Sequence, residues 1–218
     1  MNLKGIPKPI LLVWLALAIS IAWSFYSLRW HAALTSLMTL IMTFLPFRYE
    51  DRFEIKLPRS FSVIIVLFLY ATLFLGEVGD FYERFWWWDV VLHGGSAVAF
   101  GLFGFLGIFM LFQGDRFAAP PLAIATLSFC FAVAIGAVWE IFEFSMDQIF
   151  KLNMQKSGLI DTMWDLIVDC GGAFFGASSG YLYLKARESG GPLAGWIEDF
   201  IRKNRRFFRK SRHKSKSK

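Results

Sequence analysis

The sequence predicts an all-α polytopic membrane protein, a helical bundle with about six transmembrane helices. Of its 218 residues, 56% are hydrophobic and 18% aromatic, and the mean hydropathy is +0.48. Charged residues make up only 18%, against about a quarter in soluble domains. Several apolar runs also approach the roughly 20 residues that a helix needs to cross a bilayer. These observations exclude an ordinary soluble domain.

The first three predicted spans cover residues 9–28, 31–47 and 61–80. The first apolar run is too long for the core of a signal peptide, so we expect a retained helix. The second has only about 17 apolar residues, which leaves open whether the first two spans both cross fully. The charged segment 47–60 is predicted to be a loop.

The other three predicted spans cover residues 88–113, 120–144 and 161–184. A triple tryptophan, Trp86 to Trp88, precedes the fourth span and is typical of an anchor at the membrane interface. Two prolines begin the fifth span, where a missing backbone N–H does no harm. The polar segment 150–158 then connects the fifth span to the sixth.

The basic residues predict the orientation. If both termini are cytoplasmic, 19 of the 23 Lys and Arg residues lie on the cytoplasmic side. This excess is the usual mark of cytoplasmic loops, so we predict an N-in, C-in topology. Ten of the 17 acidic residues then lie on the opposite, extracytoplasmic side. We expect a plasma-membrane or inner-membrane protein whose acidic side faces outward.

We predict two parts, a six-helix transmembrane domain at residues 1–186, with its core motif region at 88–184, and a cytoplasmic tail at 187–218. In the tail, apolar residues recur at helical spacing from Leu193 to Ile201, and a basic run follows. This pattern favours an amphipathic helix on the anionic cytoplasmic leaflet, followed by a disordered end. Attraction to lipid headgroups accounts for the basic run, so lipids and not nucleic acid are the expected partners. A homo-oligomer stays open.

Small residues mark the helices that we expect to pack closely. Gly172, Gly176 and Gly180 follow one another at intervals of four, and the fourth span carries five glycines. In a membrane, such residues let helix backbones approach. The two cysteines, Cys130 and Cys170, fall inside predicted spans and show no disulfide or zinc-finger spacing.

Acidic side chains concentrate in the stretch from Trp139 to Gly172. Six carboxylates lie there: Glu140, Glu143, Asp147, Asp161, Asp165 and Asp169. Their spacing puts each set of three on one face of its helix. In the fourth span, Asp89 and His93 are four residues apart and share a face. All of these residues lie at the predicted outer ends of their spans, so they could converge.

Converging carboxylates restrict the chemistry of the site. They cannot all be ionised side by side unless a cation neutralises them. The fourth, fifth and sixth spans contain no Lys or Arg. We therefore predict a divalent metal ion, either Mg²⁺, Mn²⁺, Ca²⁺ or Zn²⁺, since carboxylates with one imidazole suit these ions and iron. The expected ligands are Glu140, Glu143, Asp147, Asp161, Asp165 and Asp169.

Less specific interpretations stay open at these positions. Asp147 and Asp161 lie near helix ends, where solvated charge is tolerated, and Asp161 could cap its helix. A hydrogen-bond network that merely holds helices together could include four of them: Asp165, Asp169, Glu140 and His93. Asp89 could orient the imidazole of His93 as a general base, which makes these two residues the predicted catalytic pair.

The motif residues resemble the VanZ-like membrane proteins and a related group of bacterial inner-membrane proteins, the YjdF-like proteins. The VanZ-like pattern has an Asp four residues before His-Phe, a Glu on a later helix, and a final Asp, three residues, Asn and a Gly. The matching residues here are Asp89 with His93, Glu140 or Glu143, and Asp165 with Asp169 and Gly172.

Two positions depart from the VanZ-like pattern, since Gly94 replaces the Phe and Asp169 the Asn. The two acidic pairs of the fifth and sixth spans look closer to the YjdF-like proteins. The resemblance covers residues 88–184, under half the chain. It implies a multi-pass protein of the cell envelope and brings no particular reaction with it.

Three functions follow as hypotheses. The first is a metal-dependent enzyme that acts at the outer leaflet on a lipid or lipid-linked envelope substrate. The second is a cation or proton transporter, since acids inside a membrane are usual in such paths. Against it, the cytoplasmic halves of the last three spans are almost wholly apolar. The third is a scaffold with a structural ion.

Overall fold

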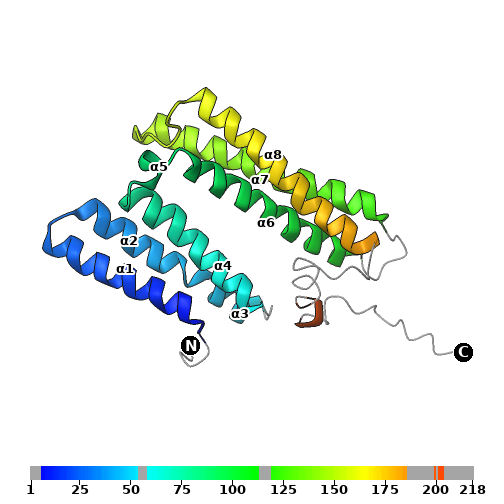
Figure 1. Cartoon of the computed structure of the whole chain (residues 1–218), viewed down its shortest axis with the longest axis horizontal. Helices are drawn as coiled ribbons and strands as arrows, with labels where there is room; N and C mark the ends of the chain where they lie inside the picture. The colour runs from blue at the N-terminus through cyan, green and yellow to red at the C-terminus, as the bar shows by residue number, and fades with distance from the viewer. Residues whose placement is uncertain (1–5, 54–57, 113–118, 186–198, 200, 204–218) are drawn as a thin grey trace, which may run out of the picture. The chain divides into compact units, whose positions relative to one another are not determined.

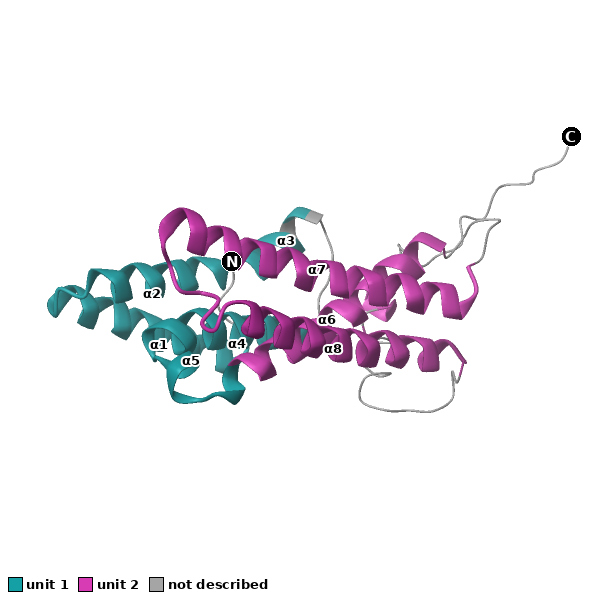
Figure 2. Cartoon of the chain, turned by 90° about the horizontal axis from the view of Figure 1, so that it is seen from above, with its two compact units in different colours: residues 1–88 teal, residues 89–218 magenta. Residues whose placement is uncertain are grey.

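The computed structural model describes residues 6–53, 58–112, 119–185, 199 and 201–203. Over these residues the chain forms helices and no strands, which confirms the all-α class (Figure 1). The chain divides into two compact units, residues 1–88 and residues 89–218 (Figure 2). Most of the predicted tail lies outside the described residues.

The first unit contains six helical segments in its described residues. They are α1 (Lys8–Tyr26), α2 (Trp30–Met42), α3 (Leu45–Phe53), α4 (Arg59–Leu69), the π-helix η2 (Tyr70–Val78) and α5 (Phe81–Arg84). The core of the unit is apolar, and Ile10, Val13 and Leu17 of α1 bury against Val66 of α4. Hydroxyl groups also join α1 to α2, since Ser20 Oγ lies 3.0 Å from Ser36 Oγ.

The second predicted span is interrupted, contrary to expectation. Helix α2 ends at Met42, and α3 then continues to Phe53, so the first half of the predicted loop 47–60 is helical. Thr43 lies at the break, where its hydroxyl accepts a hydrogen bond from Trp14 Nε1 at 2.9 Å and donates one to the Leu40 carbonyl at 2.6 Å. A side chain that bonds the backbone in this way competes with the regular helix ladder.

Five helical stretches in the described chain are long and apolar enough to cross a bilayer. They are Lys8–Tyr26, Trp30–Glu50, Arg59–Val78, Trp87–Phe112 and Pro121–Phe150. These stretches correspond to the first five predicted spans. The sixth predicted span forms α8 (Leu159–Lys185), which has 27 residues but is not among the five. Its aspartates and its glycine and serine residues reduce its hydropathy.

The second unit is built from α6 (Trp87–Phe112), α7 (Pro121–Phe150) and α8. The division between the units falls just inside α6, after Trp88. Helix α7 continues six residues beyond the predicted end at 144. Residues 151–158 connect α7 to α8, and Gly158 closes this connection in the left-handed conformation, with φ at +65°. Only glycine adopts that conformation without strain.

Helices α6 and α8 run parallel, with their backbones in close approach. The two helices meet at Gly94 beside Gly172 and again at Gly101 beside Gly176, so both chains advance in the same direction. Helix α7 runs back in the opposite direction and is antiparallel to both (Figure 1). The N-terminal ends of α6 and α8 and the C-terminal end of α7 therefore meet at one end of the unit.

The burial pattern of α8 is inverted relative to a helix of a soluble protein. Its buried residues include Asp165, Asp169 and Gly176, whereas Trp164 and Phe174 are more than 60% exposed. Water would disfavour such a surface, but lipid tails accept it. The fold therefore supports a membrane location for α8, although its aspartates keep it below the hydropathy of the other spans.

The contact between α6 and α8 gives a prediction for Gly172. A Cβ atom at this position would lie 2.5 Å from the Gly94 carbonyl oxygen and 2.8 Å from Ala97 Cβ. Because backbone cannot yield as a flexible side chain does, Gly172→Ala is expected to lower the free energy of unfolding by about 1–3 kcal/mol. Thermal unfolding in detergent, followed by tryptophan fluorescence, measures the change.

Gly171→Ala is the matched control, since nothing lies within 4 Å of a Cβ atom at Gly171. Alanine is the better helix former by about 1 kcal/mol, so this variant should be neutral or slightly stabilised. Equal unfolding midpoints for the two variants would contradict the close approach.

Candidate metal centre

The acidic residues of the second unit gather at one end of the three helices. Asp89 and His93 lie in the first two turns of α6, and Asp165 and Asp169 lie in the second and third turns of α8. Glu140 lies ten residues before the end of α7. Because α7 is antiparallel to α6 and α8, its C-terminal part lies beside their N-terminal parts. The acidic residues of the three helices therefore meet, as their helical spacing predicted.

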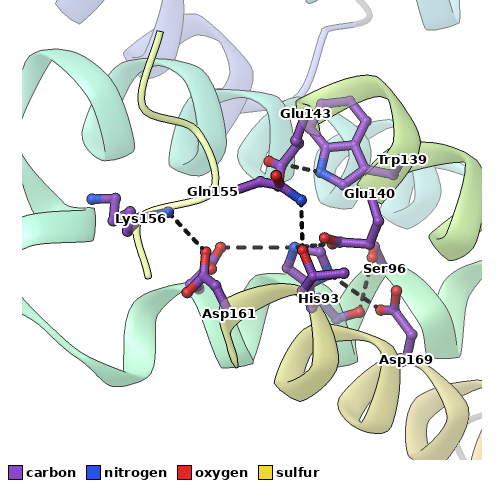
Figure 3. A network of polar contacts seen from close by, with 11 residues as sticks. His93, Ser96, Trp139, Glu140, Glu143, Gln155, Lys156, Asp161 and Asp169 are labelled. Atoms are coloured by element: carbon purple, nitrogen blue, oxygen red, sulfur yellow. Dashed lines mark hydrogen bonds and ion pairs between the residues drawn. The ribbon is translucent and has the colours of Figure 1, made fainter. Parts of the chain in front are cut away.

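His93 is the centre of this group (Figure 3). On one edge of its ring, Nε2 lies 3.8 Å from Asp89 Oδ1 and 4.0 Å from Glu140 Oε1. On the other edge, Nδ1 lies 3.4 Å from Asp169 Oδ1. The imidazole is thus surrounded by carboxylates from all three helices. It is 8% exposed, so these interactions are formed away from solvent.

Three of these residues are close enough to share one ion. Each of Asp89, His93 and Asp165 offers a ligand atom, and the three atoms lie within 4.8 Å of one another. Asp165 is buried, whereas the side chain of Asp89 is 35% exposed. The cluster is therefore closed on the α8 side and accessible beside Asp89. Carboxylate oxygen and imidazole nitrogen are ligands that Mn²⁺ and Zn²⁺ accept, and Mg²⁺ and Ca²⁺ prefer the oxygens.

Buried carboxylate oxygens beside His93 have no hydrogen bond in the described chain. They are both oxygens of Glu140, whose residue is 4% exposed, and Oδ2 of Asp169, whose residue is 2% exposed. Leaving such groups unpaired costs several kcal/mol, far more for an ionised carboxylate than for a neutral group. Helices α6 and α7 contain no Lys or Arg, and α8 contains only Lys185 at its opposite end. The chemistry of the cluster therefore calls for a cation or for protons.

Gly136 of α7 makes room for Asp169. A Cβ atom at Gly136 would collide with Asp169 Oδ2 and lie 2.9 Å from Asp169 Cγ. Asp169 therefore fits against the α7 backbone only because this position has no side chain. The sequence contained a signal that was not used, since Gly136 lies four residues before Glu140 on the same helix face.

The other three predicted ligands have different partners. Glu143 accepts a hydrogen bond from Trp139 Nε1 at 3.1 Å. The carboxylate of Asp147 accepts from the backbone N–H groups of Met154 and Gln155, at 2.8 and 2.9 Å. Asp161 accepts from the Lys156 N–H at 3.1 Å.

These bonds give Asp147 and Asp161 a clear structural role, since both hold the connection 151–158; Figure 3 shows the bond of Asp161 to Lys156. Asp161 does not cap its helix, because α8 begins two residues earlier, at Leu159. A further bond, from Gln155 Nε2 to Thr162 Oγ1 at 2.5 Å, closes the same connection onto α8. The spacing of the acids alone did not separate these roles from metal binding.

The bonds of Asp147 give a second prediction. The Asp147→Asn variant loses one acceptor oxygen and its charge, so it is expected to cost about 1–3 kcal/mol of local stability in the connection. Hydrogen exchange should show faster exchange at the amides of Met154 and Gln155. The same change at Asp80, which is exposed and pairs only loosely with Arg84 at 3.5 Å, is the control. Unchanged protection in Asp147→Asn would contradict the role.

Comparisons with known proteins add a family to this geometry. Residues 9–186 match the family described as "Predicted membrane protein (DUF2238)", a range that includes almost all of α1 to α8. A protein of Thermotoga maritima described as "Uncharacterized protein" is 28% identical over 131 residues, which are 60% of this chain and 67% of that protein. No solved structure matches.

Proposed function

The chain belongs to the DUF2238 family of predicted membrane proteins, and from this premise we propose that it binds a divalent metal ion among α6, α7 and α8. Asp89, His93 and Asp165 are the proposed ligands, and Glu140 lies 4.0 Å from Nε2 of His93, the ring nitrogen that also faces Asp89. Glu143, Asp147 and Asp161 are assigned no ligand role, because each has another hydrogen-bond partner.

The unpaired carboxylate oxygens carry this proposal. Acidic clusters are common without an ion, but most are exposed to water. Here the oxygens of Glu140 and Asp169 are buried around an imidazole, and α6, α7 and the part of α8 near them contain no Lys or Arg; the charge of Lys156, in the connection 151–158, acts on the more accessible Asp89. A divalent ion beside Glu140 would neutralise two carboxylates at once, whereas Oδ2 of Asp169 lies against the α7 backbone at Gly136.

The finer function that we propose is a metal-dependent enzyme for lipid or lipid-linked substrates of the cell envelope. A bound ion would polarise a phosphoryl or acyl oxygen and acidify a water molecule. The half-exposed Asp89 lies on the accessible side, where a substrate would arrive. Exposed aromatic residues of α7 and α8 near the cluster, such as Phe142 and Trp164, suit contact with lipid. The resemblance to VanZ-like and YjdF-like proteins supports an envelope role.

We also propose that the site faces the extracytoplasmic side of the plasma or inner membrane, because the positive-inside rule places the basic loops in the cytoplasm. A reporter fused after Lys218 should then behave as cytoplasmic. An extracytoplasmic signal from that fusion would reverse the orientation of the site.

Equilibrium dialysis with elemental analysis tests the shared premise. Purified protein in detergent is expected to retain about one equivalent of Mg²⁺, Mn²⁺, Ca²⁺ or Zn²⁺, and to unfold at a lower temperature after chelation because an ion bound only to the folded state stabilises it. If none of these ions binds and a chelator leaves the unfolding temperature unchanged, the proposal is wrong. Ion flux into proteoliposomes would identify a transporter instead.

A further inference from the structure

The two ring nitrogens of His93 have different surroundings, and each suits a different task. Nε2 faces Asp89 and Glu140, from α6 and α7, whereas Nδ1 faces Asp169 of α8 at 3.4 Å. We infer that Asp169 is a positioning residue, which accepts the Nδ1–H of His93 and so leaves Nε2 as the metal-binding atom. This inference rests on the proposed metal site and distinguishes the residues that bind the ion from the residue that orients its histidine ligand.

A neutral imidazole has one N–H donor and one nitrogen with a free lone pair. Metal-binding histidines generally donate the N–H of the other nitrogen to a carboxylate or carbonyl, which fixes the tautomer and strengthens the ligand. Asp169 lies on the correct side of the ring for this task. Asp89 does not, because its Oδ1 lies 3.8 Å from Nε2, on the opposite edge of the ring.

The position of Asp169 against α7 supports the same assignment. Its Oδ1 faces His93, and its Oδ2 fills the space above Gly136, where a Cβ atom would collide with it. Oδ2 therefore faces the α7 backbone, with little space for an ion between them. The group that lies within 4.8 Å contains Asp165, one helical turn earlier on α8, and does not contain Asp169.

Asp169 and not Asp89 is thus the partner that orients the ring. The spacing of four residues between Asp89 and His93 made Asp89 the natural candidate, but the shorter contact comes from the neighbouring helix. Asp89, with its half-exposed side chain, becomes the proposed ligand on the accessible side.

Nuclear magnetic resonance of cadmium-loaded protein with labelled histidines tests this inference. The scalar coupling to cadmium is expected at Nε2 of His93, and Nδ1 is expected to carry a hydrogen-bonded proton. In Asp169→Asn the affinity for Cd²⁺ should fall about 10- to 100-fold, as for other partners of metal-bound histidines. The stoichiometry and the coupled nitrogen should stay the same. Asp161→Asn, on the same helix with its carboxylate on the Lys156 N–H, is the control and should leave affinity unchanged.

Coupling at Nδ1, or an unchanged affinity in Asp169→Asn, would overturn the inference while the metal site itself stands. If the wild-type protein binds no Cd²⁺ or other divalent ion, the proposed function fails. The resonance of the Nδ1 proton in the ion-free protein still decides the role of Asp169. A proton that is protected in the wild type and lost in Asp169→Asn supports it, and one that is unaffected by the substitution rejects it.

Discussion

Asp165→Asn is expected to reduce the affinity for a divalent ion by more than about 100-fold, which corresponds to about 2.8 kcal/mol. Asp165 is the buried carboxylate among the three proposed ligands Asp89, His93 and Asp165. Because it is buried, water cannot easily take its place beside the ion when the carboxylate is removed. An amide keeps the shape of the side chain but lacks the charge that opposes the ion. The loss should exceed that of Asp169→Asn, because a ligand and not its neighbour is removed.

Isothermal titration of the ion-free protein with Mn²⁺ and Zn²⁺ measures this loss. The control is Asp161→Asn, which makes the same chemical change one turn earlier on α8, at a carboxylate that holds the Lys156 N–H. Without an ion, Asp165→Asn should unfold at the same temperature as the wild type or a higher one, since a buried charge has been removed. Wild-type affinity in Asp165→Asn would exclude this residue as a ligand.

The spans of the fold were predictable, because a bilayer demands about 20 apolar residues in each crossing helix. The prediction was wrong where single side chains change the backbone. The hydroxyl group of Thr43 bonds the backbone where α2 ends. Helix α7 continues to Phe150, beyond the predicted end, and the carboxylate of Asp147 within it accepts a hydrogen bond from the connection that follows. Neither effect alters the hydropathy of a long window, so hydropathy cannot locate it.

For the candidate site, the sequence predicted that acids of three helices meet, but not which of them surround His93. Helical spacing correctly placed His93, Glu140 and Asp169 toward a common point. It could not say which carboxylate meets which ring nitrogen, because that depends on how α6, α7 and α8 are aligned along their axes. The alignment is set by close contacts such as Gly94 beside Gly172, and a single sequence does not give these pairings.

Small residues are therefore as much a part of the site as the acids. The glycines of α8 bring its backbone against α6, and this approach places Asp165 near Asp89 and His93. Gly136 does the same from the α7 side by admitting Asp169. A membrane helix gains little from burying apolar side chains, so close backbone packing is the available means of fixing such distances.

Gly136→Ala is expected to damage both the packing and the site. Its Cβ atom would lie 2.9 Å from Asp169 Cγ and 3.3 Å from Asp169 Cβ, so the carboxylate must move or the helices must separate. We expect a loss of about 1–3 kcal/mol in the free energy of unfolding. If the displaced Asp169 no longer orients His93, the affinity for a divalent ion should also fall about 10- to 100-fold.

A double-mutant cycle with Asp169→Ala separates these two effects. Without its carboxylate, residue 169 would leave only its Cβ atom near Gly136, at 3.3 Å. The stability cost of Gly136→Ala should then fall below about 0.5 kcal/mol. The two substitutions would therefore be non-additive, since the costs of independent sites add to within about that amount. The affinity should stay low in the double variant, since the partner of His93 Nδ1 is still missing. Gly95→Ala and Gly171→Ala have open space at their Cβ positions, so neither should lower the stability or the affinity. An additive cycle would mean that Gly136 acts on something other than Asp169.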